Sequence, residues 1–331
     1  MSDTPMFNRR QTFGLATGAA ALIAGLAPQE ARAQAAPLDM LRLFVPAAPG
    51  GGWDQTARSI EQVLRATGAV NGVQVTNVAG AGGAVGLPQF LNNMRGQGNT
   101  LMIAGMVMVG SLIANKSAVR ITQATPIARL TGEFLAIAVP TASPFKTAKD
   151  MVDALRADPA KVPIAGGSAG GSDHILAGMV ARAANVPAAR VSYVAFSGGG
   201  PALAALLGSQ VAAGISGYGE YAEQVKAGKL RILAISADKR QDGIDVPTLK
   251  EQGLDIELFN WRGVFAPPGI SEADRTAMIG LITRMAASQQ WADLCKQRDW
   301  TQITLPGDDY KAFIATDSTR IEGILKDLGL A

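Results

Sequence analysis

The fold of this chain is decided by residues 41–64, which have the sequence LRLFVPAAPGGGWDQTARSIEQVL. Residues 41–46 form a short apolar run that ends in proline, a pattern typical of a β-strand. Three glycines at 50–52 interrupt the run, and from Trp53 onward apolar residues recur every three or four positions. That spacing is typical of an amphipathic helix. The stretch therefore predicts a strand, a glycine turn and a helix.

The same alternation of strand and helix continues along the chain. Further strands are expected at 73–78, 101–104, 136–139, 163–165, 191–194, 211–215, 231–235 and 264–266. Further helices are expected near 147–157, 173–184, 200–208, 218–227, 272–287, 289–298 and 307–328. Alternation of this kind predicts an α/β fold with parallel sheets that are covered by helices on both faces.

Glycine clusters recur at one kind of position, just after a strand and just before a helix. They lie at 50–52, 80–83, 166–171 and 197–200. In open parallel sheets the loops at the strand ends line the ligand crevice. Free N–H groups at a helix N-terminus, together with the helix dipole, favour an anion. The four clusters predict a site that holds a carboxylate or phosphate largely with main chain and hydroxyl groups.

Composition excludes several classes of function. Among 331 residues, 48% are hydrophobic, which is enough for two cored domains. Lys plus Arg number 30 and Asp plus Glu number 27, without a basic run, so we expect no nucleic-acid partner. The chain has one histidine, His174, and one cysteine, Cys295. These counts exclude a zinc site of four Cys or His ligands and an intrachain disulfide, and we expect neither metal nor cofactor.

One motif suggests an enzyme. Gly166-Gly167-Ser168-Ala169-Gly170 matches G-x-S-x-G, the nucleophile turn of α/β-hydrolases. In that fold the histidine arrives late in the chain on a separate loop, whereas His174 would lie on the helix that the turn opens. An exported serine hydrolase that uses Ser168 is therefore kept only as an alternative, and we predict no catalytic residues.

The first 33 residues have the layout of an export signal. Arg9 and Arg10 precede an uncharged stretch at 14–27, and Ala31-Arg32-Ala33 follows. A basic segment, a short apolar segment and an A-x-A end are typical of a secretory signal, and the paired arginines are typical of the twin-arginine type. The apolar stretch is too short to cross about 30 Å of hydrocarbon as a helix. We therefore expect export to the periplasm, with cleavage near Ala33.

Several motifs, taken together, resemble one family. Residues 45–58, VPAAPGGGWDQTAR, are similar to the first strand, turn and helix of the substrate-binding receptors of tripartite tricarboxylate transporters. The resemblance continues, in the same order, at 77–83, 166–172 with His174, 193–202 and 264–270. It covers essentially the whole mature chain, and the Gly-Gly-Gly-Trp-Asp form resembles the tricarboxylate-type branch.

The resemblance implies a two-lobe, type II periplasmic binding protein of the Venus-flytrap kind with two hinge crossovers. Lobe 1 would comprise 36–134 plus 261–331, and lobe 2 would comprise 135–260. Such a receptor binds an organic carboxylate, here a citrate-like di- or tricarboxylate, and delivers it to membrane permease subunits as a monomer. A sensory protein with the same ligand but a signalling partner is the alternative.

The resemblance also implies the binding residues. Those expected on lobe 1 are Gly51, Gly52, Trp53, Asp54, Ala81 and Gly82. Those expected on lobe 2 are Ser168, Ala169, Ser197 and Gly198. Trp53 hints at a larger or flatter acid, and Phe196-Ser197 stands where many relatives have Lys-Gly, which removes one cation. We expect Asp54 to cap its helix or order a water, because direct contact between two carboxylates is repulsive.

Overall fold

The computed structural model describes residues 38–331. The predicted export signal at 1–33 and its cleavage site lie outside the described residues. Within residues 38–331 no helix combines the length and the apolar character that crossing a membrane requires.

One sheet, called sheet A here, has the strand order β2-β1-β3-β9-β4-β10. Its strands are β1 (Leu38–Val45), β2 (Val70–Asn77), β3 (Thr100–Gly105), β4 (Thr125–Pro140), β9 (Phe259–Ala266) and β10 (Thr301–Pro306). Its helices are α1 (Gly52–Ala66), α2 (Gly86–Asn93), α3 (Met106–Ala114), α8 (Glu272–Ala286), α9 (Gln289–Gln297) and α10 (Gly307–Asp327). The strands β1, β2 and β3 run parallel, whereas β9 is antiparallel to both of its neighbours.

A second sheet, called sheet B here, has the order β6-β5-β7-β4-β8. Its further strands are β5 (Ile164–Gly166), β6 (Tyr193–Ala195), β7 (Ala213–Gly217) and β8 (Leu230–Ile235). Its helices are α4 (Ala148–Ala157), α5 (Ser172–Ala183), α6 (Gly199–Leu207) and α7 (Tyr218–Lys226). As in sheet A, the parallel strands are followed by helices, so their carboxyl ends lead into helix N-termini.

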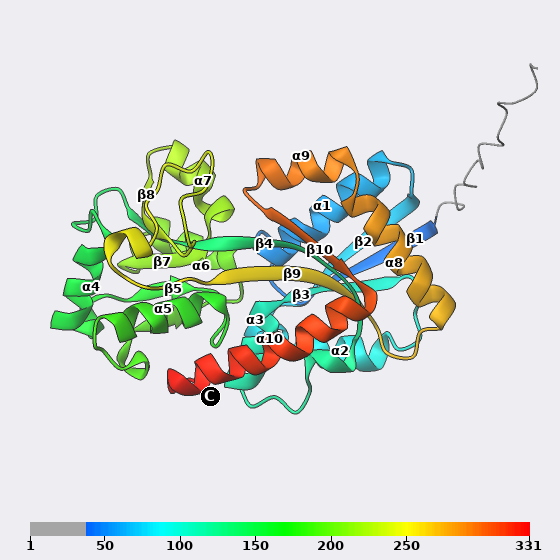
Figure 1. The fold of residues 1–331 in the computed structure, drawn as a ribbon, viewed down its shortest axis with the longest axis horizontal. Helices are drawn as coiled ribbons and strands as arrows, with labels where there is room; N and C mark the ends of the chain where they lie inside the picture. The colour runs from blue at the N-terminus through cyan, green and yellow to red at the C-terminus, as the bar shows by residue number, and fades with distance from the viewer. Residues whose placement is uncertain (1–37) are drawn as a thin grey trace, which may run out of the picture. The chain divides into compact units, whose positions relative to one another are not determined.

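Strand β4 belongs to both sheets, and Figure 1 shows it running with β9 through the middle of the described chain. Phe134 pairs with Phe259 of β9, and the next residue, Leu135, pairs with Gly217 of β7. Alternate residues of its second half face opposite sides of sheet B, as the pleat requires. Leu135, Ile137 and Val139 join the larger hydrophobic cluster, and Ala136 and Ala138 join the smaller one.

The structure departs from the sequence prediction in strand direction and in four elements. The sheets are mixed rather than wholly parallel, because β4, β9 and β10 return antiparallel to their neighbours. The prediction omitted β10, α2, α3 and the first half of β4. That half carries Arg129 and Glu133 among its apolar residues, so it lacks the continuous apolar run of a central strand. Helix α3, MVMVGSLIA, is apolar on every side and has no helical period.

Candidate functional site

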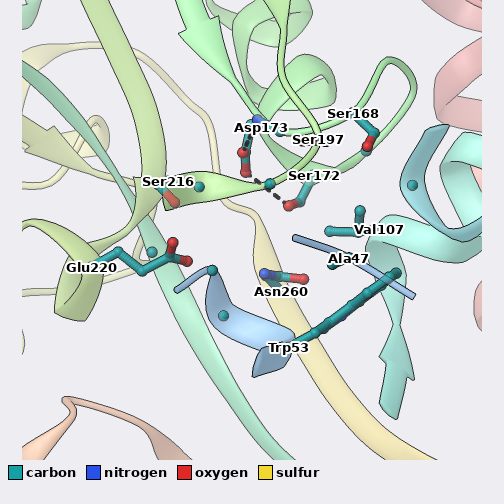
Figure 2. Close-up of a pocket in the computed structure, with 18 of the residues that line it drawn as sticks. Ala47, Trp53, Val107, Ser168, Ser172, Asp173, Ser197, Ser216, Glu220 and Asn260 are labelled. Atoms are coloured by element: carbon teal, nitrogen blue, oxygen red, sulfur yellow. Dashed lines mark hydrogen bonds between the residues drawn. The ribbon is translucent and has the colours of Figure 1, made fainter. Parts of the chain in front are cut away.

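A pocket lies where the strand-end loops of the two sheets meet, and Figure 2 shows the side chains around it. It encloses about 560 Å³ of empty space, including its open mouth. Lining residues come from the loops after β1 and β2 of sheet A and from the loops after β5, β6 and β7 of sheet B. The pocket therefore occupies the position at which open α/β sheets hold their ligands.

Most of the sequence-predicted binding residues meet at this pocket. Those that line it are Gly51, Gly52, Trp53, Gly82, Ser168, Ser197 and Gly198. Asp54, Ala81 and Ala169 do not line it. Ala81 is exposed in the left-handed region, with φ of 45°, and Ala169 is half-buried in the loop after β5.

The buried Asp54 carboxylate is fully engaged beside the pocket. Its Oδ2 accepts a hydrogen bond from the Gly50 N–H at 3.0 Å, and its Oδ1 accepts one from Asn77 Nδ2, also at 3.0 Å. Arg58 Nε lies 3.6 Å from the same Oδ1. Asp54 thus joins the glycine turn, the start of α1 and the end of β2.

Three helices start at the pocket wall. The first residues of α1, α5 and α6 are Gly52, Ser172 and Gly199, and all three line the pocket. The first N–H groups of a helix have no partner within the helix, and the dipole places partial positive charge there. With the nearby hydroxyls of Ser168 and Ser197, this wall can donate several hydrogen bonds to an anion.

The loops of the two sheets touch across the pocket. The Ala48 N–H, after β1, donates to the Ser197 carbonyl, after β6, at 3.3 Å. A Cβ atom on Gly51 would lie 3.2 Å from the Gly199 nitrogen, so there is little room for a side chain. At Gly52 a Cβ would collide with the guanidinium of Arg262. These glycines allow the backbones and Arg262 to approach closely.

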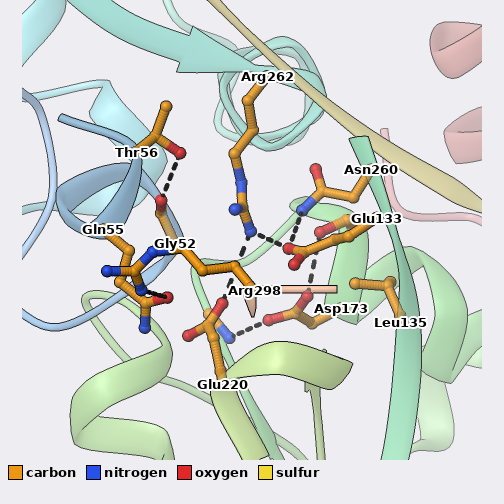
Figure 3. A network of polar contacts seen from close by, with 12 residues as sticks. Gly52, Gln55, Thr56, Glu133, Leu135, Asp173, Glu220, Asn260, Arg262 and Arg298 are labelled. Atoms are coloured by element: carbon orange, nitrogen blue, oxygen red, sulfur yellow. Dashed lines mark hydrogen bonds and ion pairs between the residues drawn. The ribbon is translucent and has the colours of Figure 1, made fainter. Parts of the chain in front are cut away.

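The floor of the pocket contains a buried ionic network, drawn in Figure 3. Arg262 of β9 pairs with Glu133 of β4, and its Nη2 lies 3.7 Å from Oε1 of Glu220 on α7. Asn260 donates from Nδ2 to Glu133 Oε1 at 3.4 Å. Burial lowers the pKa of Arg262 to about 9, with a smaller contribution from the charge of Arg298, so Arg262 stays charged at neutral pH.

Two carboxyl groups of this region titrate above their usual range. Burial raises the pKa of Glu220 to about 8, and the negative charge of Asp173 adds to the rise, while the Ser216 hydroxyl and the Gly52 N–H oppose it. Burial also raises the pKa of Asp173 to about 6. Asp173 accepts from the Gly167 N–H at 2.7 Å and from the Ser172 hydroxyl at 3.0 Å, which stiffens the loop after β5.

His174 holds the loop after β5 through a hydrogen bond and a stacking contact. Its Nδ1 accepts the Gly170 N–H at 3.0 Å, and its ring stacks on Tyr193 with centroids 4.2 Å apart. Tyr193 in turn donates its hydroxyl to the Gly167 carbonyl at 2.7 Å. Because Nδ1 is already an acceptor for the backbone, that nitrogen is not free to take a proton from Ser168. Burial lowers the pKa of His174, which favours the neutral ring.

Sequence reasoning missed several pocket residues. Ser216 and Gly217 end β7 directly before α7, so the strand-end rule applied to the other loops would have found them. Asn260 and Arg262 lie within a strand that is otherwise apolar, and a charged residue at such a place is the signal that was available. Glu220 had no local signal, because a glutamate in the first turn of a helix is ordinary.

The pocket has no metal-binding character among residues 38–331, since no three His, Cys, Asp or Glu side chains gather there or elsewhere in that range as metal ligands would. Helix N-termini and hydroxyls donate from its walls. On its floor the Asn260 amide is present beside Glu220, whose raised pKa of about 8 lets its carboxyl donate as well as accept at neutral pH.

Comparisons with known proteins agree on one family. The family model described as tripartite tricarboxylate transporter family receptor matches residues 56–330. Protein BugT of Bordetella pertussis is 26% identical over 302 residues, which cover 88% of this chain and 90% of that protein.

Solved structures share the fold. The periplasmic binding protein BugD superposes with a TM-score of 0.80 at 22% identity, covering 89% of this chain and 99% of that one. MatC from Rhodopseudomonas palustris with bound malate gives a TM-score of 0.77 at 23% identity, and the match covers 87% of this chain and 99% of MatC.

Proposed function

The chain belongs to the tripartite tricarboxylate transporter receptor family, and we propose that it is a periplasmic receptor that delivers an organic carboxylate to a membrane permease. Members of this family are substrate-binding receptors rather than enzymes. The observation that carries the proposal is the convergence of three helix N-termini and two serine hydroxyls on one pocket between the sheets. That arrangement suits a carboxylate held without a dedicated cation.

The proposal includes two lobes that close on the ligand. Lobe 1 would comprise 36–134 plus 261–331, and lobe 2 would comprise 135–260. The change of pairing partner at Phe134 and Leu135 supports a crossover there, because the two halves of β4 belong to different sheets. Strand β9 begins at Phe259 and pairs in sheet A, so the chain returns there from sheet B, which supports the second crossover. Hinges of this kind need only a few residues that absorb changes in φ and ψ.

A panel of organic acids tests the function. MatC is described with bound malate, and the sequence resemblance favours di- and tricarboxylates such as citrate. A ligand that binds only the folded state raises its stability by about 2.7 kcal/mol at a hundredfold excess over Kd. We expect at least one carboxylate to raise the melting temperature while remaining chemically unchanged. No shift across mono-, di- and tricarboxylates, or release of a product, would overturn the proposal.

The binding residues can be tested singly. A hydrogen bond to a charged acceptor contributes roughly 1.5–3 kcal/mol, so Ser168→Ala and Ser197→Ala are each expected to raise Kd about 10- to 100-fold. Trp53 is the one tryptophan among the pocket-lining residues, so its fluorescence should change on binding, and Trp53→Phe should remove most of that change. Wild-type affinity in the double serine variant would show that the ligand is held elsewhere.

Location and partner need experiments in cells. N-terminal sequencing of the exported protein is expected to begin near Gln34, and size-exclusion chromatography is expected to give a monomer. Deleting the gene should abolish uptake of the ligand through the permease. Intact uptake with a lost transcriptional response to the same ligand would instead identify a sensory protein.

A further inference from the structure

Helix α10 extends from one sheet to the other. Its 21 residues span about 30 Å, at about 1.5 Å per residue. Its first half is fixed to sheet A, where Trp261 of β9 donates from Nε1 to Asp317 at 2.6 Å and packs its ring against Tyr310. Figure 1 shows α10, in red, passing α3 and ending near α5, which packs on sheet B. The helix thus carries the residues after it from lobe 1 toward lobe 2 of the proposed receptor.

Residues 328–330, called the clasp here, form a defined turn at the end of α10. Gly329 lies in the left-handed region with φ of 67°, and the Leu330 N–H donates to the Leu325 carbonyl at 2.8 Å. These features are typical of a Schellman motif, which ends a helix with a glycine in this conformation. Leu328 is 7% exposed and belongs to the larger hydrophobic cluster, and Leu330 packs against that cluster. The turn therefore directs two leucines into the protein.

The clasp meets lobe 2 at a glycine. Gly178 is buried in α5, and a Cβ atom placed on it would lie 3.1 Å from Leu328 Cδ1 and 3.6 Å from Leu330 Cδ1. The same position lies 3.3 Å from the Cβ atom of Ala188, which follows α5 in the chain. The two leucines therefore lie over the α5 backbone, where the absence of a side chain leaves room for them. The same helix begins at Ser172 on the pocket wall.

We propose that the clasp is a non-covalent connection between the lobes, in addition to the two strand crossovers, and that it favours the closed arrangement and slows ligand release from outside the pocket. The inference rests on the proposed function, because lobes that open and close are part of it. The crossovers are covalent and join the lobes in every arrangement. The clasp contacts lobe 2 only while α5 lies beneath its leucines, so the apolar area that it buries stabilises the closed arrangement alone.

The buried area is large enough to change the balance between open and closed lobes. Burying one leucine side chain shifts an equilibrium by at least about tenfold. The clasp contributes one leucine that is almost fully buried and a second that is partly buried. None of its residues lines the pocket. Weakening the clasp therefore leaves the contacts to the ligand in place and makes closure less favourable.

Ligand kinetics test the proposal. The probes are malate, succinate and citrate, and the one that binds the wild type most tightly is followed by stopped-flow fluorescence. The double variant Leu328→Ala with Leu330→Ala should release it about tenfold faster, with a similar rise in Kd, because the contact to α5 is lost. Leu328→Met with Leu330→Met keeps the apolar volume and should restore slow release. An unchanged release rate in the double alanine variant would overturn the proposal.

A matched control separates the clasp from a general loss of stability. Leu281 on α8 is 6% exposed, and α8 packs against α1, α9 and β10, which all belong to lobe 1. Leu281→Ala should lower the unfolding free energy and leave the release rate unchanged. Equally fast release in Leu281→Ala and in the double alanine variant would show that destabilisation alone is responsible, and it would overturn the proposal.

Small-angle scattering tests the clasp without any ligand. The double alanine variant should have a larger radius of gyration than the wild type, because its open fraction increases, while Leu281→Ala should keep the wild-type radius. If no carboxylate binds the wild type, the proposed function fails, and the scattering alone decides on the clasp. In that case a larger radius supports the clasp and an unchanged radius overturns it.

Gly329→Ala is the milder variant if the double alanine protein does not fold. An alanine at φ of 67° disfavours the turn while both leucines remain. It should release the same probe at least about twofold faster than the wild type, since part of the Schellman motif is lost. Release at the wild-type rate in Gly329→Ala would then overturn the proposal.

Discussion

At the scale of single residues, Asp54 joins the pocket wall to its support. Its carboxylate accepts hydrogen bonds from the Gly50 N–H and from Asn77, each at 3.0 Å. Asp54→Ala leaves the Gly50 N–H without its acceptor and leaves Asn77 Nδ2 with only its bond to the Ala47 carbonyl. The change should cost about 1–3 kcal/mol of unfolding free energy and weaken ligand binding. Asp54→Asn keeps one acceptor oxygen and should lose less of both. Urea unfolding and titration calorimetry measure the two effects. The Asp54 carboxylate does not cap α1 as the sequence suggested, since no side chain accepts from the first N–H groups of that helix. Equal losses in the two variants would contradict its role as the acceptor for Gly50 and Asn77.

Arg262 compensates the buried charge of Glu133. Both side chains are almost fully buried, so Arg262→Met leaves the Glu133 carboxylate without its partner. Removing one member of a buried ion pair typically costs about 3–5 kcal/mol. The double variant Arg262→Met with Glu133→Gln removes the unpaired charge and should recover much of that loss. Chemical unfolding of the three proteins is the measurement. A double variant less stable than Arg262→Met would show that the pair is not coupled in this way.

At the scale of elements, local patterns predicted helices and strands well where each pattern is self-contained. The strand, turn and helix at 41–64 appear as β1 and α1, because proline, glycines and an amphipathic period mark their ends. Strand β10 was missed because its residues are largely exposed and it is recognisable only by its pairing with β4. The glycine loops predicted one wall of the pocket. The floor was predictable only in part. Arg262 stands out as a charged residue in an otherwise apolar strand, but its meeting with Glu133 and Glu220 depends on the tertiary fold.

Helix α3 limits how closely the two sides of the pocket approach. A Cβ atom on Gly110 would collide with the carbonyl oxygen of Gly170 in the loop after β5. We expect Gly110→Ala to hold the two loops apart and raise Kd at least tenfold. It should also lower the unfolding free energy by about 1–3 kcal/mol, because the collision with a backbone carbonyl outweighs the gain in helix propensity from Gly to Ala. Calorimetry and urea unfolding measure these two quantities.

The control for Gly110→Ala is Gly323→Ala. Gly323 lies on the exposed face of α10, and no atom lies within 4 Å of a Cβ placed there. This variant should show the helix-propensity gain with an unchanged Kd. If Gly110→Ala also leaves Kd unchanged, the contact between α3 and the Gly170 loop plays no part in binding.

At the scale of the whole molecule, the buried acids make stability depend on pH. Glu220 titrates near 8 when folded and near 4.5 when unfolded, so the folded state binds more protons in between. Unfolding free energy should therefore fall as pH rises from about 5 to 8. Glu220→Gln should show a smaller fall. His174, whose pKa burial lowers, acts in the opposite direction in both proteins and cancels from the difference. Urea unfolding at pH 5, 6, 7 and 8 measures it, and identical slopes would exclude Glu220 as the source.

The place of β9 in sheet A has a consequence for biosynthesis. The strand comes from residues 259–266, yet it lies between β3 and β4, which are made more than 100 residues earlier. During translation β3 and β4 are therefore synthesised before the strand that separates them in sheet A. That strand, β9, leaves the ribosome only with the last quarter of the chain. Non-local pairing of this kind slows folding and prolongs the exposure of apolar edges. We therefore expect this topology to lengthen the time during which chaperones bind the apolar edges of the nascent chain.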